Sequence, residues 1–113
     1  MFYMPQYHNL PDGRQVFLRF PDPERHADPV SRLLPEVPGG EPAKAFLSAA
    51  NAHPLRLVLV AEIQGEVAGC GLLELEGTPR AQTAVEEAFR SPELEQLLAE
   101  SLAAVAAQKG VEL

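Results

Sequence analysis

The fold is decided by residues 55–76, whose sequence is LRLVLVAEI-QG-EVAGCGLLELE. Residues 55–63 are mostly branched and apolar, which favours a β-strand. Gln64-Gly65 predicts a tight turn, because glycine adopts a positive φ without steric cost. Residues 66–76 then return as the partner strand, so the stretch predicts an antiparallel hairpin. Gly69 and Gly71 inside the second strand indicate a bulge or a close approach of another backbone.

The chain begins with a segment that predicts no regular element. Residues 1–14 are expected to form an irregular arm, because prolines and a glycine interrupt them and Pro11-Asp12-Gly13 is a turn signal. The arm carries an apolar and aromatic group that either packs over the core or docks on a partner chain. This group consists of Met1, Phe2, Tyr3, Met4 and Tyr7.

A strand and two helices are predicted between the arm and the hairpin. Residues 15–20 alternate as a short strand. Asp22-Pro23-Glu24 has the N-cap, first-position proline and first-turn acid of a helix start. Pro29 leaves two alternatives, a kinked helix over 23–34 or one that begins at 29. A second helix is expected over 42–51. The strand is expected to place Val16, Leu18 and Phe20 on one face and Phe17 and Arg19 on the other. The side chains expected to be buried are Val30, Leu33 and Leu34 of the first helix, and Ala45, Phe46 and Ala49 of the second.

A third strand and a long helix are predicted after the hairpin. Residues 81–89 are expected to be a strand with Val85 and Phe89 inward, after a turn at 77–80. Ser91 and Pro92 then open a helix that Gly110 ends, and Val111 is expected to begin another strand. The core is expected to form between the hairpin and this helix. Its predicted members are Leu57, Leu59, Val67, Leu72, Leu97, Leu98 and Leu102.

Composition excludes several classes of partner. The 113 residues are enough for one domain with its own core. The net charge is −7, and residues 61–113 carry ten acids against three bases. Nucleic acid and anionic membranes are therefore not expected as partners, because both require clustered Lys or Arg. No apolar run approaches the roughly 20 residues of a membrane span. The N-terminus lacks signal-peptide features and Cys70 is the single cysteine, so a cytoplasmic location is expected.

The order β-α-α-β-β-β-α-β resembles the GNAT N-acetyltransferase superfamily. The resemblance rests on residues 16–24, 60–75 and 91–113. It implies an α+β fold with a mostly antiparallel meander sheet packed with helices, in which residues 15–113 form a single GNAT-like domain. The chain matches the N-terminal two-thirds of that fold. The helix and two strands that complete the family's fold have no counterpart here.

The resemblance fails at the place where the family binds acetyl-CoA. Family members have a loop of the form Gln/Arg-x-x-Gly-x-Gly/Ala before the third helix, but no glycine occurs here between Gly77 and Gly110. Pro92 removes one backbone donor, and two acids stand where a phosphate would bind. No cofactor is therefore expected. The residues of this degenerate loop are Arg90, Ser91, Glu93 and Glu95.

The remaining candidates for catalysis are few. The family's glutamate base could correspond to Glu86 or Glu87, which are expected to point to opposite faces of their strand. Its tyrosine acid has no counterpart, since no tyrosine follows Tyr7.

The other reactive side chains are expected to have structural roles. We interpret Cys70 as a small, buried apolar residue. We expect a solvated strand end at Glu74 and Glu76. Surface or helix-capping roles are expected for His8, His26 and His53. None of the histidines lies at metal-ligand spacing from Cys70, so no metal site is expected.

These observations lead to three hypotheses of function. The first is a degenerate GNAT-like module without acyltransferase activity, which self-associates and binds a protein or a small ligand. The second is an N-acetyltransferase with an atypical acetyl-CoA site completed across a dimer. The third is a structural subunit of a larger complex. A homodimer is expected because the sequence ends at Val111-Glu112-Leu113, which leaves a sheet edge to be covered.

Overall fold

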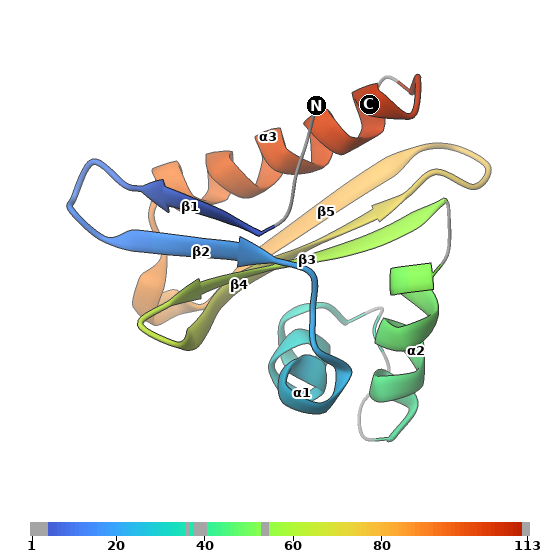
Figure 1. Ribbon diagram of the computed structural model, residues 1–113, viewed down its shortest axis with the longest axis horizontal. Helices are drawn as coiled ribbons and strands as arrows, with labels where there is room; N and C mark the ends of the chain where they lie inside the picture. Colours follow the sequence, from blue (N-terminus) through green and yellow to red (C-terminus); the bar gives the residue numbers. More distant parts are fainter. Residues whose placement is uncertain (1–4, 36, 38–40, 53–54, 112–113) are drawn as a thin grey trace.

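The computed structural model describes residues 5–35, 37, 41–52 and 55–111, which form an antiparallel sheet covered by helices on both faces (Figure 1). The sheet has five strands in the order β1-β2-β3-β4-β5. The strands are β1 (Gln6–Asn9), β2 (Gln15–Arg19), β3 (Arg56–Ile63), β4 (Glu66–Glu74) and β5 (Arg80–Val85). Helices α1 (Pro23–Leu33) and α2 (Glu41–Ala52) lie on one face, and α3 (Pro92–Gln108) lies on the other. The predicted α+β fold with a meander sheet is confirmed.

The β3–β4 hairpin forms as the sequence predicts. Its two-residue turn has positive φ at both Gln64 (54°) and Gly65 (80°), the backbone that matches the twist of the paired strands. Side chains of β3 alternate between the two layers. Leu59 and Ala61 pack in the core under α3, whereas Val58 and Val60 pack against α1 and α2. The same alternation directs Glu62 toward α1.

A bulge interrupts the ladder near this turn. Ala61 pairs with Gly69, but the next residue, Glu62, pairs with Val67, so Ala68 is an extra residue in β4. The Ala68 carbonyl accepts the backbone N–H of Glu86 at 2.8 Å. The bulge therefore fixes the chain where it leaves β5.

The N-terminal prediction was wrong for residues 6–9, which are not irregular. They form β1, an edge strand that pairs with β2 and places Tyr7 opposite Phe17. The Tyr7 and Phe17 rings stack at 4.7 Å, a cross-strand contact that the prolines on either side of β1 do not interrupt. The turn around Gly13 is confirmed by its φ of 93°. Of the aromatic and apolar group of the arm, residues 1–4 lie outside the described residues.

The predicted shared face of β2 was right for two of its three residues. Val16 and Leu18 are fully buried, but Phe20 follows the end of the strand and is 44% exposed. The alternation of a strand does not continue past its last residue, so Phe20 is free to turn outward.

Helix α1 begins at Pro23 and continues through Pro29. The alternative in which the helix begins at 29 is therefore wrong. Asp22 caps the helix by accepting the Glu24 N–H at 3.0 Å. Val30 and Leu34 are buried as predicted, and Leu33 is partly buried.

The predicted buried face of α2 was wrong. Ala45 and Ala49 are exposed, and Phe46 is only partly buried. The buried face consists of Ala43, Leu47 and Ala50. This face is the buried one because it places Leu47 in the core at helical spacing. The Phe46 ring lies at the rim, where the Arg56 guanidinium is 5.1 Å from the ring centroid.

The predicted third strand was too long. Strand β5 ends at Val85, and residues Glu87–Phe89 form the 3₁₀ turn η1. The prediction that Glu86 and Glu87 point to opposite faces of a strand is therefore wrong. Val85 is buried and Phe89 is partly buried against the core, as expected.

Helix α3 has the predicted start, with Ser91 as its N-cap and Pro92 in its first turn. Its inner face packs on β4 through the two glycines. A Cβ at Gly69 would lie 2.9 Å from the Ala84 carbonyl oxygen, and one at Gly71 would lie 2.9 Å from Leu102. Val111 is not in a strand, and residues 112–113 lie outside the described residues.

The predicted core is largely confirmed. Leu59, Leu72, Leu98 and Leu102 are fully or almost fully buried, and Leu57, Val67 and Leu97 are partly buried. Among the helices of the described ranges, none is long and apolar enough to span a membrane.

We expect Leu98→Ala to lower the free energy of unfolding by about 2–5 kcal/mol, because it leaves a cavity between α3 and Gly69 of the sheet. The matched control is Leu97→Ala, one position along the helix at a partly buried site, which should cost clearly less. Urea unfolding followed by circular dichroism measures both. Equal losses from the two variants would show that another face of α3 carries the packing.

Candidate functional site

A cleft of about 460 Å³ opens between α1, the β3–β4 turn and the chain that follows β5. It lies at the end of the sheet where the bulge is found. Charged and apolar side chains line it together. They are Arg25, His26, Pro29 and Arg32 of α1, Glu62, Gly65, Glu66 and Val67 of the hairpin, and Glu86, Ala88 and Phe89 after β5.

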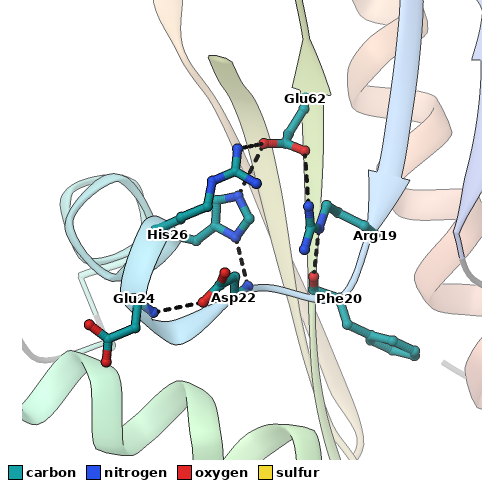
Figure 2. Close-up of polar contacts among 7 residues, drawn as sticks. Arg19, Phe20, Asp22, Glu24, His26 and Glu62 are labelled. Carbon is teal, nitrogen blue, oxygen red and sulfur yellow. Dashed lines mark hydrogen bonds and ion pairs between the residues drawn. The ribbon is translucent and has the colours of Figure 1, made fainter. Parts of the chain in front are cut away.

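Glu62 is a buried carboxylate at the floor of this cleft, with only 4% of its surface exposed. Figure 2 shows the groups that converge on it. The Arg25 guanidinium donates to Oε2 at 3.1 Å, and Arg19 lies 3.7 Å from Oε1. His26 Nε2 is 3.1 Å from Oε2. Because a buried charge is costly without partners, this arrangement of two cations and one ring N–H is what allows a carboxylate to remain there.

His26 is held through both ring nitrogens (Figure 2). The backbone N–H of Asp22 donates to Nδ1 at 2.7 Å, so Nδ1 must be the nitrogen without a proton. Nε2 therefore carries the proton and donates it to Glu62. The ring is buried and links the N-cap residue of α1 to the floor of the cleft. With both nitrogens engaged, His26 positions its neighbours and has no free nitrogen to act as a base.

The sequence prediction for His26 was wrong in part. The residue does lie beside the start of a helix, but it is buried and bonds a carboxylate 36 positions away. Glu62 was not identified as a site residue at all. A signal was available, because Val58, Val60 and Glu62 alternate onto one buried face, and a carboxylate on such a face requires a partner.

Glu86 lies in the cleft, and Glu87 is exposed and not part of its lining. Glu86 is positioned by its backbone bond to Ala68, and its side chain forms an ion pair with Arg32 across the cleft.

Cys70 is buried in β4, as predicted. Burial, and secondarily the negative charge of Glu86, raise the pKa of the Cys70 thiol to about 12. The thiolate, which is the nucleophilic form, is therefore scarce near neutral pH.

The start of α3 is closed by contacts within the chain. The Ser91 hydroxyl accepts the Leu94 N–H at 3.2 Å. Arg14, on the β1–β2 loop, donates to the Phe89 carbonyl at 3.0 Å and to the Ser91 hydroxyl at 3.2 Å. Asp12 holds Arg14 from the other side at 2.7 Å. The Arg14 guanidinium thus occupies the corner between η1 and α3.

Few backbone donors remain at this helix start. The amide of Phe89 donates to the Glu86 carbonyl, that of Arg90 to the Glu87 carbonyl, and that of Glu95 to the Ser91 carbonyl. Pro92 has no N–H. The side chains of Glu93 and Glu95 are exposed in the first turn, and Arg90 lies 3.8 Å from Glu95. The segment from Arg90 to Glu95 is therefore a capped helix start with two acids in its first turn.

This architecture is similar to that of a solved protein described as the acetyltransferase of the GNAT family from Streptococcus pneumoniae. The TM-score is 0.72 at 17% sequence identity, over 86% of this chain and 70% of that one. The chain has a GNAT-like fold. No protein-family model and no curated protein sequence matches the chain.

The GNAT-like fold brings together residues that are distant in sequence. Glu86 meets Arg32 and Glu62 meets His26 at the cleft, whereas Arg90, Ser91, Glu93 and Glu95 lie outside its lining. Glu74 at the other end of β4 pairs with Arg80 at 2.9 Å, and Glu76 is exposed beyond the strand. His8 bonds Gln6 at 2.8 Å, and His53 lies outside the described residues. Within the described ranges, no group of three His, Cys, Asp or Glu side chains could hold a metal ion.

We expect Glu62→Leu to destabilise the fold near the low end of the roughly 3–5 kcal/mol that breaking a buried ion pair costs. The low end applies because Arg25 is half exposed and can be hydrated. Glu62→Gln should cost less, since its amide oxygen can still accept the His26 N–H. The control Glu74→Leu breaks a more exposed pair and should cost under about 1 kcal/mol. Urea unfolding at pH 7 gives the order, and a Glu62→Leu loss no larger than that of Glu74→Leu would contradict it.

Proposed function

We propose that this chain is a GNAT-like module without acyltransferase activity, which binds a small ligand or a protein segment in the cleft under α1. The observation that carries the proposal is the start of α3. In the family that the sequence resembles, this turn offers its backbone donors to acetyl-CoA. Here the amides of Phe89, Arg90, Leu94 and Glu95 already donate within the chain, and Arg14 fills the corner.

Electrostatics at this helix start argue in the same direction. A helix N-terminus stabilises a nearby anion by about 0.3–1 kcal/mol. Glu93 and Glu95 already use that stabilisation, and their charges would repel a pyrophosphate. The Arg14 guanidinium is likewise already paired with Asp12. The pKa of Asp12 is held below its ordinary value, chiefly by the hydrogen bond from the Arg14 backbone N–H. An incoming phosphate would have to displace these contacts before gaining its own.

The cleft under α1 is the better place for a ligand. Its volume of about 460 Å³ falls within the range of small-molecule sites, roughly 300–1,000 Å³. Its lining combines apolar side chains with polar groups that could orient a ligand.

We expect no binding of acetyl-CoA at micromolar concentration, because the amides of Phe89, Arg90, Leu94 and Glu95 and the Arg14 guanidinium already donate within the chain. Isothermal titration calorimetry measures this, and a thermal shift gives a second readout. A ligand at 100 times its dissociation constant would stabilise the fold by about 2.7 kcal/mol. Glu93→Gln combined with Glu95→Gln should leave the fold intact, since Ser91 still caps the helix. A micromolar or tighter dissociation constant for acetyl-CoA would sink the proposal.

We also propose that the module self-associates as a homodimer. The observation that supports this is an exposed aromatic surface at the β1 edge of the sheet. Tyr7 is 66% exposed and stacks on Phe17, and Phe20 is 44% exposed. Phe17 and Phe20 line a hollow together with Pro5 and Arg19. Exposed aromatic surface beside an edge strand favours association between copies.

Light scattering at micromolar concentration should then give a mass near twice the 12.3 kDa of one chain. Tyr7→Ser combined with Phe20→Ser should shift the protein toward the monomer. Leu55→Ser is the matched control, because Leu55 is 41% exposed but lies before β3, away from this surface. A monomeric mass for the unaltered protein would contradict the dimer.

One observation favours a second candidate function, an N-acetyltransferase whose acetyl-CoA site is completed across the dimer. Glu86 lies in the cleft at the end of β5, where a base could accept a proton from an amine. This alternative requires acetyl-CoA binding that appears only when the protein is dimeric. Titration of acetyl-CoA at protein concentrations above and below the dimer dissociation constant separates it from the first proposal.

A further inference from the structure

Two ion pairs span the cleft from α1 to the sheet. Arg25 meets Glu62, and Arg32 meets Glu86. Since Arg25 and Arg32 are seven residues apart, they lie on the same face of the helix, about 10 Å apart along its axis. One wall of the cleft therefore presents two guanidinium groups and the opposite wall presents carboxylates.

The two ion pairs differ in how easily a ligand can replace one of the partners. Glu62 is buried and has three partners, so its pair belongs to the framework. The Arg32–Glu86 pair stands at the mouth, with 65% of the Arg32 side chain and 29% of the Glu86 side chain exposed. An exposed pair of this kind contributes little to stability. Its two charges can therefore change partners at small cost.

A third carboxylate gives the mouth of the cleft more negative than positive charges. Glu66 lines the cleft and is exposed, and no cation lies within ion-pair distance of it among the residues that the structure describes. A simple cation held by both Glu66 and Glu86 would leave Arg32 without its partner. A simple anion that took Arg32 would leave Glu86 without its partner. A molecule with both charges restores a partner to each side.

We propose that the cleft binds a small zwitterion of the α-amino acid type. Its ammonium group is held by Glu86 and Glu66, and its carboxylate by Arg32. Pro29, Val67 and Phe89 supply apolar surface for an aliphatic or aromatic side chain. This inference rests on the proposed ligand-binding function and names the ligand class.

The test is an NMR titration of the ¹⁵N-labelled protein with L-leucine and, separately, L-phenylalanine. Either amino acid should cause saturable shifts of the Gly65, Glu66 and Ala88 amides, which line the cleft. L-leucinamide lacks the carboxylate and N-acetyl-L-leucine lacks the ammonium group. Each should bind at least about tenfold more weakly than L-leucine, because one charge-assisted contact is lost.

Arg32→Gln sharpens the test. It should weaken L-leucine about tenfold without weakening L-leucinamide, because the amide has no carboxylate for Arg32 to bind. The matched control is Arg80→Gln, which removes an arginine from an exposed ion pair at the far end of β5. It should change neither affinity.

Two outcomes overturn the inference. One is equal affinity for L-leucine and L-leucinamide in the unaltered protein, which would mean a site for simple cations. The other is the absence of saturable shifts with both amino acids. Neither outcome affects the proposal that acetyl-CoA does not bind. Conversely, formation of N-acetyl-leucine from L-leucine and acetyl-CoA would defeat the proposed non-catalytic function while supporting the ligand class of the cleft.

Discussion

A single buried carboxylate constrains the arrangement of α1 on the sheet. Removing Glu62 from water costs several kcal/mol, which only close partners can offset. Those partners come from different elements: Arg19 from β2, and Arg25 with His26 from α1. His26 in turn bonds the amide of Asp22, the residue that caps α1. The start of α1, the end of β2 and the turn end of β3 must therefore meet at one point, and the cleft is the space left beside that point.

The bulge at Ala68 links this framework to the exposed side of the cleft. It changes the pairing of Glu62 from the register set by Ala61, and its carbonyl holds the Glu86 amide. The extra residue in β4 thus anchors Glu86 at the mouth of the cleft, next to the place where Glu62 projects from β3. Since β5 ends at Val85, the chain turns into η1 and carries Phe89 over the cleft. The shape of the site follows from a local irregularity of the sheet.

The sequence predicted features that depend on neighbouring residues. The Gln64-Gly65 turn, the Asp22 and Ser91 caps and the inner face of α3 are local signals, and all were found. The contacts that make the site are not local. His26 meets Glu62 36 positions away, Arg32 meets Glu86 54 positions away, and Arg14 reaches Phe89 75 positions away. The buried face of α2 and the pairing of β1 depended in the same way on surfaces that only the folded sheet provides.

The two ends of the segment from Glu86 to Ser91 differ in how their polar groups are used, and this difference bears on whether the chain binds a cofactor or a ligand in the cleft. At Ser91, Arg14 and the helix cap use the groups that a phosphate would need, and two acids stand in front of them. At Glu86, the pair with Arg32 is exposed, and Glu66 adds a further charge to the same cleft. The contacts at Ser91 use no side chain of the cleft. Arg14 bonds η1 and the start of α3, Asp12 pairs with Arg14, and neither residue lines the cleft. Under the proposed function, a GNAT-like fold without an acetyl-CoA site can still hold a ligand in the cleft, because separate side chains build the two positions.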